Sequence, residues 1–223
     1  MSSRETHNPD RQAVPVLPEP TIRRLPWYLA YVDILRAQGV STVSSTQISR
    51  ALSVDASQIA KDLSFLSIKG KTRIGYSVDA LSDALNELLA FRVPHNAFIA
   101  GVGSLGEALI HDHGLANYGL NIVAGFDVNP ELIGTSICHV PVYHPDEMKG
   151  RQAANPAAIG ILTVPVDRAQ DVADTMVAAG IKAIWNFTPY RVRVRDGIVL
   201  SNTSIYAHLA LIYNRLASRH PDL

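Results

Sequence analysis

The sequence of 223 residues predicts an α/β protein in which a small helical domain precedes a doubly wound parallel sheet. Three observations predict this fold. Three short helix patterns and a basic, glycine-bounded stretch follow one another between residues 27 and 78. A short apolar strand then runs directly into the glycine-rich segment GVGSLG at 101–106. From there to residue 187, strand and helix patterns alternate, which is typical of a parallel sheet with helical crossovers.

Composition excludes several classes of protein. Hydrophobic residues make up 47% and charged residues 18% of the chain, and no apolar run reaches the roughly 18 residues of a membrane span. The polar start, residues 1–19, contains three prolines and lacks the layout of a signal peptide, so we expect a flexible leader. The lone Cys138 cannot form an internal disulfide, and we expect it to be a buried small hydrophobe in a cytoplasmic protein.

Residues 20–92 predict a winged helix-turn-helix domain that ends in a linker helix. The first helix pattern begins at Trp27 and stops at Gly39. A second helix follows the N-cap candidates at 44–46, and a third follows cap candidates near residue 55. Three helices followed by a hairpin give the element order of this DNA-binding fold.

The basic stretch IKGKTRIGYSV at 68–78 predicts the hairpin wing, with three cations on one side of a strand, and 79–91 predicts the linker helix. Residues 20–78 carry eight basic and three acidic residues, a net charge of +5 within a chain whose formal charge is zero. In such a fold the third helix enters the major groove and the wing touches the backbone. The alternative is that the polar helix residues form an ordinary solvated surface. The expected DNA-binding residues are Ser45, Thr46, Ser57, Gln58, Lys61, Lys69, Lys71 and Arg73.

Residues 93–202 predict a Rossmann domain that binds a dinucleotide. Gly101 permits the tight turn, Gly103 lets the backbone approach a pyrophosphate, and Gly106 lets the helix lie close to the strand. Asp127 ends the next strand, 26 residues after Gly101, where a carboxylate accepts hydrogen bonds from ribose hydroxyls. The same carboxylate would repel a 2′-phosphate, so NAD(H) is favoured over NADP(H). The alternative is an ordinary turn between a strand and a helix.

Taken together, KDLSFLSIKGKTRIGYSV, GVGSLGEAL, FDVNPELIG with PVYH, ILTVP and KAIWNFTP resemble, in order and spacing, the redox-sensing transcriptional repressors of the Rex family. The likeness runs from about residue 25 to the end. It implies a homodimer that binds double-stranded operator DNA, senses the NADH/NAD⁺ ratio and is released by NADH. It also implies that the C-terminal helix, within 203–223, is exchanged between subunits. The apolar stripe of this helix fits equally well a helix packed on its own sheet.

The motifs and the resemblance together give a set of candidate cofactor residues. The set is Gly101, Val102, Gly103, Ser104, Leu105, Gly106, Asp127, Thr163, Val164, Pro165, Asn186 and Phe187. The last five, with Pro189, are expected near the nicotinamide ring, where NADH and NAD⁺ differ; the partner's Ile205 and the partner's Tyr206 are further candidates. Two positions depart from the family. His113 stands where a tyrosine is common, and Ala60 where many relatives carry a second cation.

No catalytic or metal site is expected, so the protein is not expected to be an enzyme. The cysteine and histidines do not supply the four ligands of a structural zinc site, and no nucleophile motif occurs. An NAD-dependent oxidoreductase or a CoA-binding subunit is the alternative that uses the same glycine loop. About twenty residues beyond the predicted sheet leave no room for its substrate domain. A third possibility is an architectural DNA-binding protein that does not respond to NADH.

Overall fold

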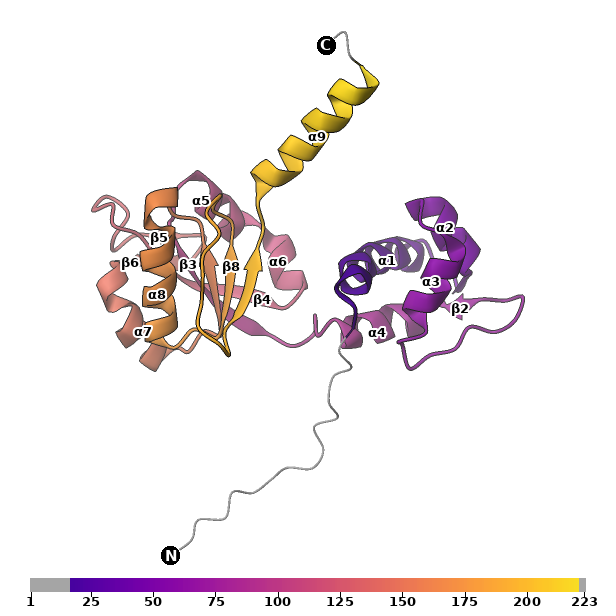
Figure 1. The fold of residues 1–223 in the computed structure, drawn as a ribbon. Coiled ribbons are helices and arrows are strands. Elements are labelled where there is room, and N and C mark those ends of the chain that lie inside the picture. The colour runs from indigo at the N-terminus through magenta and orange to yellow at the C-terminus, as the bar shows by residue number, and fades with distance from the viewer. Residues whose placement is uncertain (1–16, 221–223) are drawn as a thin grey trace, which may run out of the picture. The chain divides into compact units, whose positions relative to one another are not determined.

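The computed structural model describes residues 17–220, and the chain divides between Arg92 and Val93 into two compact units (Figure 1). The first unit has one hydrophobic core, and the second has two, which share no residue with the first. The predicted leader, residues 1–19, lies almost entirely outside the described residues. Its last residues belong to the first unit, however, because Leu17 is buried there.

Helix α1 (Glu19–Ala37) begins earlier than the predicted start at Trp27. Pro20 occupies its first turn, where the missing N–H of proline costs no helical hydrogen bond. The buried residues of the helix also begin before the predicted start, with Thr21 and Leu25. Leu25 is fully buried, whereas the Trp27 side chain lies on the surface of this unit with 59% exposure.

The helix-turn-helix consists of α2 (Ser45–Leu52) and α3 (Ala56–Leu63), as the sequence predicts. Ser44 caps α2 in a capping box, and the Asp55 carboxylate accepts backbone hydrogen bonds at the start of α3. Between the two helices, Ser53 adopts a left-handed conformation with φ of 56°. This conformation reverses the chain within the turn and favours glycine, so serine holds it at a cost.

The predicted hairpin is present only as a tight turn, in which Lys71 and Gly75 form an antiparallel bridge with two backbone hydrogen bonds of 2.8 Å. Strand β2 (Tyr76–Ser77) pairs antiparallel with β1 (Thr42–Val43), which precedes α2, and not with residues 68–71. Gly75 brings the two strands together: its φ is 95°, and a Cβ there would lie 2.4 Å from the carbonyl oxygen of Val43. The stretch therefore leaves α3 as an irregular loop and joins the sheet only at its end.

The three predicted wing cations lie on this loop, between α3 and β2, and all are exposed. Lys71 forms one isolated bridge with Gly75, and Arg73 has a left-handed φ of 65° at the turn. The prediction that Lys69, Lys71 and Arg73 line one side of a strand is therefore wrong, because a turn interrupts the extended chain. Helix α4 (Val78–Leu88) follows β2 and packs against α1.

The second unit, over residues 93–220, is built on a seven-stranded sheet with the order β5-β6-β4-β3-β7-β8-β9. Neighbouring strands are parallel except in the β5–β6 pair. The winding reverses between β3 and β7, so the carboxyl ends of the central strands form one edge of the sheet. This confirms the predicted Rossmann fold. The strands are β3 (His95–Ala100), β4 (Leu120–Phe126), β5 (Ser136–Ile137), β6 (Val140–Tyr143), β7 (Ile159–Leu162), β8 (Ala183–Asn186) and β9 (Val199–Asn202).

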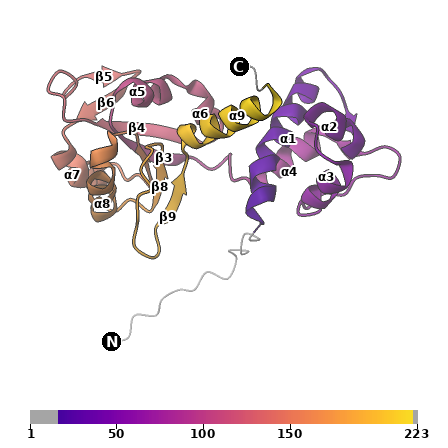
Figure 2. The same ribbon diagram turned by 45° about the horizontal axis from the view of Figure 1, so that its top comes forward.

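Helices cover both faces of this sheet (Figures 1 and 2). On one face, the core beneath α5 includes Ile99 and Ile110; on the other, the core beneath α8 includes Phe98 and Met176. Alternate residues of β3 thus enter opposite cores, as expected of a strand covered on both faces. The helices are α5 (Ser104–His111), α6 (His113–Asn117), α7 (Met148–Ala154) and α8 (Ala169–Ala179), with short 3₁₀ turns at Pro145–Glu147 and Val166–Arg168.

Strands β5 and β6 are joined by a two-residue turn, Cys138 and His139, with φ values of 45° and 70°. Positive φ at both central residues is the geometry of a tight hairpin turn. Such a turn lies at the surface, and Cys138 is exposed. The expectation that Cys138 is buried is therefore wrong.

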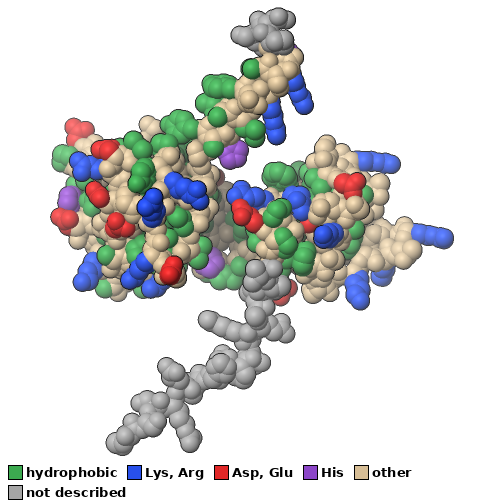
Figure 3. Space-filling model, in the orientation of Figure 1, with side chains coloured by type: hydrophobic (Ala, Val, Ile, Leu, Met, Phe, Trp, Pro, Cys, Tyr) green, Lys and Arg blue, Asp and Glu red, His purple; other side chains and the backbone are tan. Residues whose placement is uncertain are grey.

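Helix α9 (Ile205–Arg219) follows β9 and projects away from the sheet of its own unit (Figure 1). It has no buried residue, and hydrophobic side chains line its surface (Figure 3). The alternative that this helix packs on its own sheet is therefore wrong. Its exposed large hydrophobic residues are Ile205, Tyr206, Leu209, Leu211, Ile212, Tyr213 and Leu216.

Candidate functional site

The glycine loop between β3 and α5 makes close contacts that only glycine allows. Gly101 has φ of 87°, and its N–H donates to the Phe126 carbonyl oxygen at 2.8 Å. A Cβ at Gly101 would lie 2.8 Å from the carbonyl of Thr163, and one at Gly106 only 2.0 Å from the carbonyl oxygen of Gly101. The turn and the close approach of helix to strand predicted for these two glycines are thus both present.

Gly103 differs from its two neighbours, because a Cβ there would meet nothing within 4 Å. It is the N-cap of α5, and no side chain caps that helix end. The first N–H groups of α5 therefore face an open space, which suits an anionic group. Ser104 and Leu105 border this space and are exposed, while the Val102 side chain is buried in the core and contributes only its backbone.

Asp127 follows β4 and holds two loops together. Its Oδ2 accepts a hydrogen bond from the Val102 N–H at 2.7 Å, and its Oδ1 accepts one from the Asn129 N–H at 2.9 Å. Each carboxylate oxygen has a further lone pair for a ligand hydroxyl. The carboxylate is therefore fixed beside the glycine loop, at the predicted position for reading a ribose.

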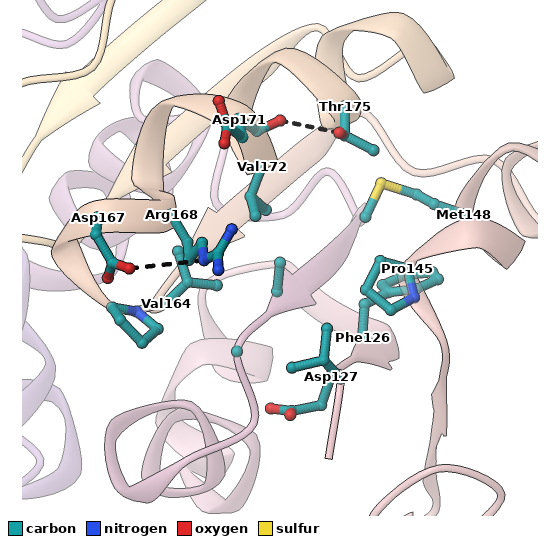
Figure 4. Close-up of a pocket in the computed structure, with 14 residues that line it drawn as sticks. Phe126, Asp127, Pro145, Met148, Val164, Asp167, Arg168, Asp171, Val172 and Thr175 are labelled. Carbon is teal, nitrogen blue, oxygen red and sulfur yellow. Dashed lines mark hydrogen bonds and ion pairs between the residues drawn. The ribbon is translucent and has the colours of Figure 1, made fainter. Parts of the chain in front are cut away.

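A cavity of about 630 Å³ lies at the carboxyl edge of the sheet (Figure 4). Figure 4 shows Asp127 at the bottom of the view and the residues of α8 at its top. The volume falls within the range of small-molecule sites. The cavity is lined by Ala100, Gly101, Phe126, Asp127, Val128, Pro145, Met148, Val164, Pro165, Asp167, Arg168, Asp171, Val172 and Thr175.

Much of this lining was not among the predicted residues, which include only Gly101, Asp127, Val164 and Pro165 of it. The largest omission is the start of α8 and the turn before it. A signal for it exists in the sequence, because a helix that follows the strand next to β3 must begin at the same edge as the glycine loop. Arg168 is the basic residue of this wall, and its Nε lies 3.6 Å from an Asp167 carboxylate oxygen.

A second cavity, of about 270 Å³, is lined by residues of α5, of the segments after β7 and β8, and of the first turn of α9. Val164 lines both cavities. The Thr163 hydroxyl donates toward the carbonyl oxygens of Ala100 at 3.0 Å and Gly101 at 2.7 Å, which ties the β7 end to the loop. The second cavity is lined by Leu105, Thr163, Val164, Phe187, Thr188, Pro189, Ile205 and Tyr206.

The residues expected near the nicotinamide ring do not all line the second cavity. Phe187 and Pro189 line the second cavity, whereas Asn186 lines neither cavity; their place near the ring stays a prediction. The Ile205 and Tyr206 found there belong to this chain's own α9, so the contribution expected from a partner's α9 stays a prediction. His113 is exposed at the start of α6 and lines neither cavity.

In the first unit, the helix α3 is anchored by the fully buried carboxylate of Asp62. Arg24 donates to it twice, at 2.7 and 2.8 Å. The Tyr28 hydroxyl and the Thr21 hydroxyl, also from α1, donate at 2.8 and 3.0 Å. The amide of Gln58 donates at 2.9 Å from within α3. The sequence hinted at this anchor, because Asp62 lies among the apolar residues of an amphipathic helix.

The Asp62 anchor changes the ionisation of the groups around it. Burial raises the pKa of Asp62, whereas the hydrogen bonds from its four partners lower it. Together these hydrogen bonds outweigh burial, so the pKa of this carboxyl lies below its ordinary value. The hydrogen bond to Asp62 raises the pKa of Arg24 above its ordinary value. Burial, followed by the hydrogen bond with Asp62, raises the pKa of Tyr28 to about 12. All three groups keep their usual charge at neutral pH.

The outer face of α3 carries the predicted DNA-reading residues. Lys61 and Ser57 are exposed, and the Ser57 hydroxyl donates to the capping Asp55. Gln58 is half-buried and held by Asp62, so its amide is less free than predicted. In α2, Thr46 is exposed and Ser45 half-buried.

Cationic side chains project from the loop between α3 and β2, at the edge of the first unit in Figure 3. Within residues 17–220, Lys61, Lys69, Lys71 and Arg73 take part in none of the salt bridges of the structure. Their charges therefore face solvent, as a phosphate-binding surface requires.

Two negative findings bear on other functions. In the part of the chain that the structure describes, no helix combines the length and hydropathy needed to cross a bilayer. Over the same residues, no group of three or more His, Cys, Asp or Glu side chains is arranged to hold a metal ion.

Two family models match the chain, one in each unit. Residues 16–64 match the family described as "Putative DNA-binding protein N-terminus", and residues 93–190 match the "CoA binding domain". The matched segments correspond to the helix-turn-helix and to the sheet with its glycine loop.

Relatives match over nearly the whole chain. The Redox-sensing transcriptional repressor Rex of Bacteroides fragilis is 56% identical over 200 residues, covering 90% of this chain and 91% of its own. The protein of the same name from Porphyromonas gingivalis is 55% identical over 202 residues, covering 91% and 93%.

Solved structures agree with these relatives. RSP in complex with β-NAD⁺ and operator DNA is similar with a TM-score of 0.87 at 36% identity, over 92% of this chain and 94% of that one. RSP in complex with β-NADH gives a TM-score of 0.82 at 36% identity, over 92% and 96%. RSP is itself described as a Rex-family repressor. The chain described here therefore belongs to the Rex family of redox-sensing transcriptional repressors.

Proposed function

We propose that this protein is a DNA-binding transcriptional repressor that senses the NADH/NAD⁺ ratio and leaves its operator when NADH binds. One observation carries the proposal: a single chain joins a helix-turn-helix with a cationic loop to a glycine loop whose Asp127 is fixed for a ribose. Its relatives over 90% of the chain are redox-sensing repressors, and it is not an enzyme.

The two cavities divide the dinucleotide between them. Adenosine lies in the larger cavity with its ribose on Asp127, the pyrophosphate crosses Gly103 at the start of α5, and the nicotinamide enters the smaller cavity. This arrangement is supported by the glycine-loop segment, because Gly101 lines the larger cavity and Leu105 lines the smaller one, and Rossmann domains bind the pyrophosphate at this loop.

The smaller cavity favours the reduced cofactor. No residue in its lining carries a formal charge, and most of the lining is apolar or aromatic. The nicotinamide ring is cationic in NAD⁺ and neutral in NADH, and burial of an unpaired charge is costly. To change the ratio of released to operator-bound protein from 1:99 to 99:1, NADH must bind the released state about 5.5 kcal/mol more favourably than the operator-bound state.

On DNA, α3 enters the major groove and presents Lys61 with Ser57, while Lys69, Lys71 and Arg73 contact the backbone. An operator read by two such helices calls for a homodimer. The exposed apolar surface of α9, which the protomer leaves uncovered, supports one. Because operator DNA is chromosomal, we place the protein in the cytoplasm.

The test is a titration of the full-length protein on a labelled palindromic operator at fixed salt. Tight binding that NADH reverses, and that an equal concentration of NAD⁺ leaves in place, is the expected result. Release by neither nucleotide would overturn the proposed sensing, and failure to bind any operator would overturn the proposed DNA binding.

Lys61→Ala should weaken operator binding about tenfold, because an exposed lysine on the outer face of α3 loses its contact with base or phosphate. The affinity for NADH, followed by its fluorescence, should not change. Lys149→Ala, which removes an exposed lysine from α7, is the matched control and should change neither. A parallel loss of both affinities in Lys61→Ala would contradict the assignment of separate roles to the two units.

Arg73→Gly should relax the backbone and weaken operator binding at the same time. The left-handed φ of 65° costs arginine about 1 kcal/mol that glycine does not lose, so thermal stability should rise or stay unchanged. Loss of one phosphate contact should make the slope of log K against log salt concentration shallower by about 0.9. Unchanged operator affinity and slope would show that the Arg73 side chain does not touch DNA.

The alternative functions are not favoured. An NAD-dependent oxidoreductase is not favoured, because the relatives that match about 90% of the chain are transcriptional repressors. An assay of hydride transfer with small alcohols and acids distinguishes the repressor from the oxidoreductase, since turnover would support an enzyme. Enhanced NADH fluorescence on mixing would exclude a DNA-binding protein that does not bind NADH.

A further inference from the structure

Asn186, at the carboxyl end of β8, is fully buried and makes four side-chain hydrogen bonds. Its amide nitrogen donates to the Tyr190 carbonyl oxygen at 2.7 Å and to Asn202 Oδ1 at 2.8 Å. Its amide oxygen accepts from the Thr188 N–H at 2.9 Å and from the Thr188 hydroxyl at 2.8 Å. A carboxamide has two donor hydrogens and two acceptor lone pairs, so all of its capacity is used within the protein.

These bonds fix one wall of the smaller cavity. Residues 187–189 line that cavity, and the two bonds to Thr188 together with the bond to Tyr190 hold this turn of chain in one shape. Because Asn186 has no free hydrogen-bonding atom and lines neither cavity, it does not act as a cofactor ligand. It acts on whatever occupies the cavity through the residues that it holds.

The same side chain reaches the base of α9. Asn202 lies opposite Asn186 in the register of β8 and β9, and the next residue, Thr203, donates its N–H to the Asn186 carbonyl oxygen at 2.8 Å. The Trp185 indole N–H donates to the Thr203 hydroxyl at 2.9 Å, and the Trp185 ring contacts Phe187 with centroids 4.5 Å apart. The wall of the cavity and the first turn of α9 are therefore connected through hydrogen bonds of β8.

We propose that Asn186 is a positioning residue that couples occupancy of the smaller cavity to the orientation of α9, with Asn202 as the connecting group. The inference rests on the proposed function for the identity of the occupant, the nicotinamide ring. A ring that displaces Phe187 or Thr188 moves Asn186, and the hydrogen bond to Asn202 carries this displacement to the strand from which α9 emerges. Since α9 has no buried residue in its own protomer, little within the unit resists its reorientation.

Asn202→Ala tests the connection from its exposed end and removes the acceptor of one donor hydrogen of the buried Asn186 amide. The coupling ratio is the operator Kd with saturating NADH divided by the Kd without it. Loss of one hydrogen bond in the connection should lower this ratio about fivefold, with the NADH affinity changed by less than about threefold. Asn202→Asp keeps an oxygen acceptor for the Asn186 amide and should restore the ratio. Asn117→Ala, at an exposed asparagine at the end of α6, is the matched control.

A second measurement on the full-length protein keeps the inference separate from the proposed function. NADH should slow amide hydrogen exchange over residues 209–216 of α9, beyond the two α9 residues that line the cavity, in the original protein and in Asn202→Asp, but much less in Asn202→Ala. An unchanged coupling ratio in Asn202→Ala, or equal protection of 209–216 in all variants, would overturn the inference. If NADH does not release the original protein from DNA, the proposed function fails, and the exchange data still decide whether Asn202 connects the cavity to α9.

Discussion

Gly106→Ala should reduce NADH affinity by at least about 100-fold, a loss of about 2.7 kcal/mol. A Cβ at this position would lie 2.0 Å from the carbonyl oxygen of Gly101, so α5 and the glycine loop must move apart. This displacement moves the N–H groups of α5 away from the pyrophosphate. NADH fluorescence titration measures the affinity, and thermal unfolding should show a loss of stability in the absence of nucleotide.

Gly103→Ala separates the fold from the binding surface. Its Cβ meets nothing within 4 Å and its φ of −75° suits alanine, so stability without nucleotide should not fall. The methyl group would instead occupy the space where the pyrophosphate approaches, and NADH should no longer raise the melting temperature. Gly150→Ala, at an open helical position of α7, is the control and should stabilise slightly. Full NADH affinity in Gly103→Ala would refute the placement of the pyrophosphate.

Asp62→Ala should destabilise the first unit by about 3–5 kcal/mol, the usual cost of leaving one member of a buried ion pair without its partner. Arg24, with a side chain only 21% exposed, would lose both of its hydrogen bonds to the carboxylate. The helix α3 would lose its attachment to α1, and operator binding should disappear at temperatures where the original protein binds. NADH affinity should remain, because the second unit shares no core residue with the first.

Asp62→Asn distinguishes charge from hydrogen bonding. The amide keeps one acceptor oxygen but offers no negative charge to Arg24, so we expect an intermediate loss of stability. Equal stability of Asp62→Asn and the original protein would show that the charge contributes nothing. Asp79→Asn, on a pair in which the carboxylate is 73% exposed, should have little effect and serves as the control.

The lowered pKa of Asp62 gives this anchor a dependence on pH. A carboxyl whose pKa is lower in the folded state contributes stability that is complete above its unfolded pKa, about 3.9. The contribution is lost as the pH falls from there through the folded pKa. The first unit should therefore lose stability below about pH 4 more steeply in the original protein than in Asp62→Asn.

The sheet and the glycine loop could be predicted because their signals are local. Gly101 and Gly106 stand where the backbone leaves no space for a Cβ, and Asp127 ends a strand whose partner is set by the fold. The wing could not be predicted in the same way. Its last residues pair with β1, which lies before α2, and this non-local pairing leaves only the bridge between Lys71 and Gly75 of the predicted hairpin.

Parts of the candidate site depended on contacts between distant segments. The predicted role of Asn186 followed from its place at the carboxyl end of β8, yet its side chain forms hydrogen bonds with the loop at 188–190 and with β9. The role of Asp62 depends on α1, more than thirty residues earlier, where Arg24 and Tyr28 point at it. Hydrophobic patterns with a period of 2 or 3.6 residues predict which face of a strand or helix is buried, but they do not predict which polar groups contact one another there.

The separation of the cores of the two units has a genetic consequence. Missense alleles that change the glycine loop but leave the second unit folded and dimeric should give a protein that still occupies its operator and ignores the cell's metabolic state, a super-repressor phenotype. Alleles that damage the core of the first unit should give constitutive expression, and in partial diploids they should be dominant through mixed dimers with one working DNA-binding domain. Super-repressor alleles in a random mutant library should therefore map to residues after 92.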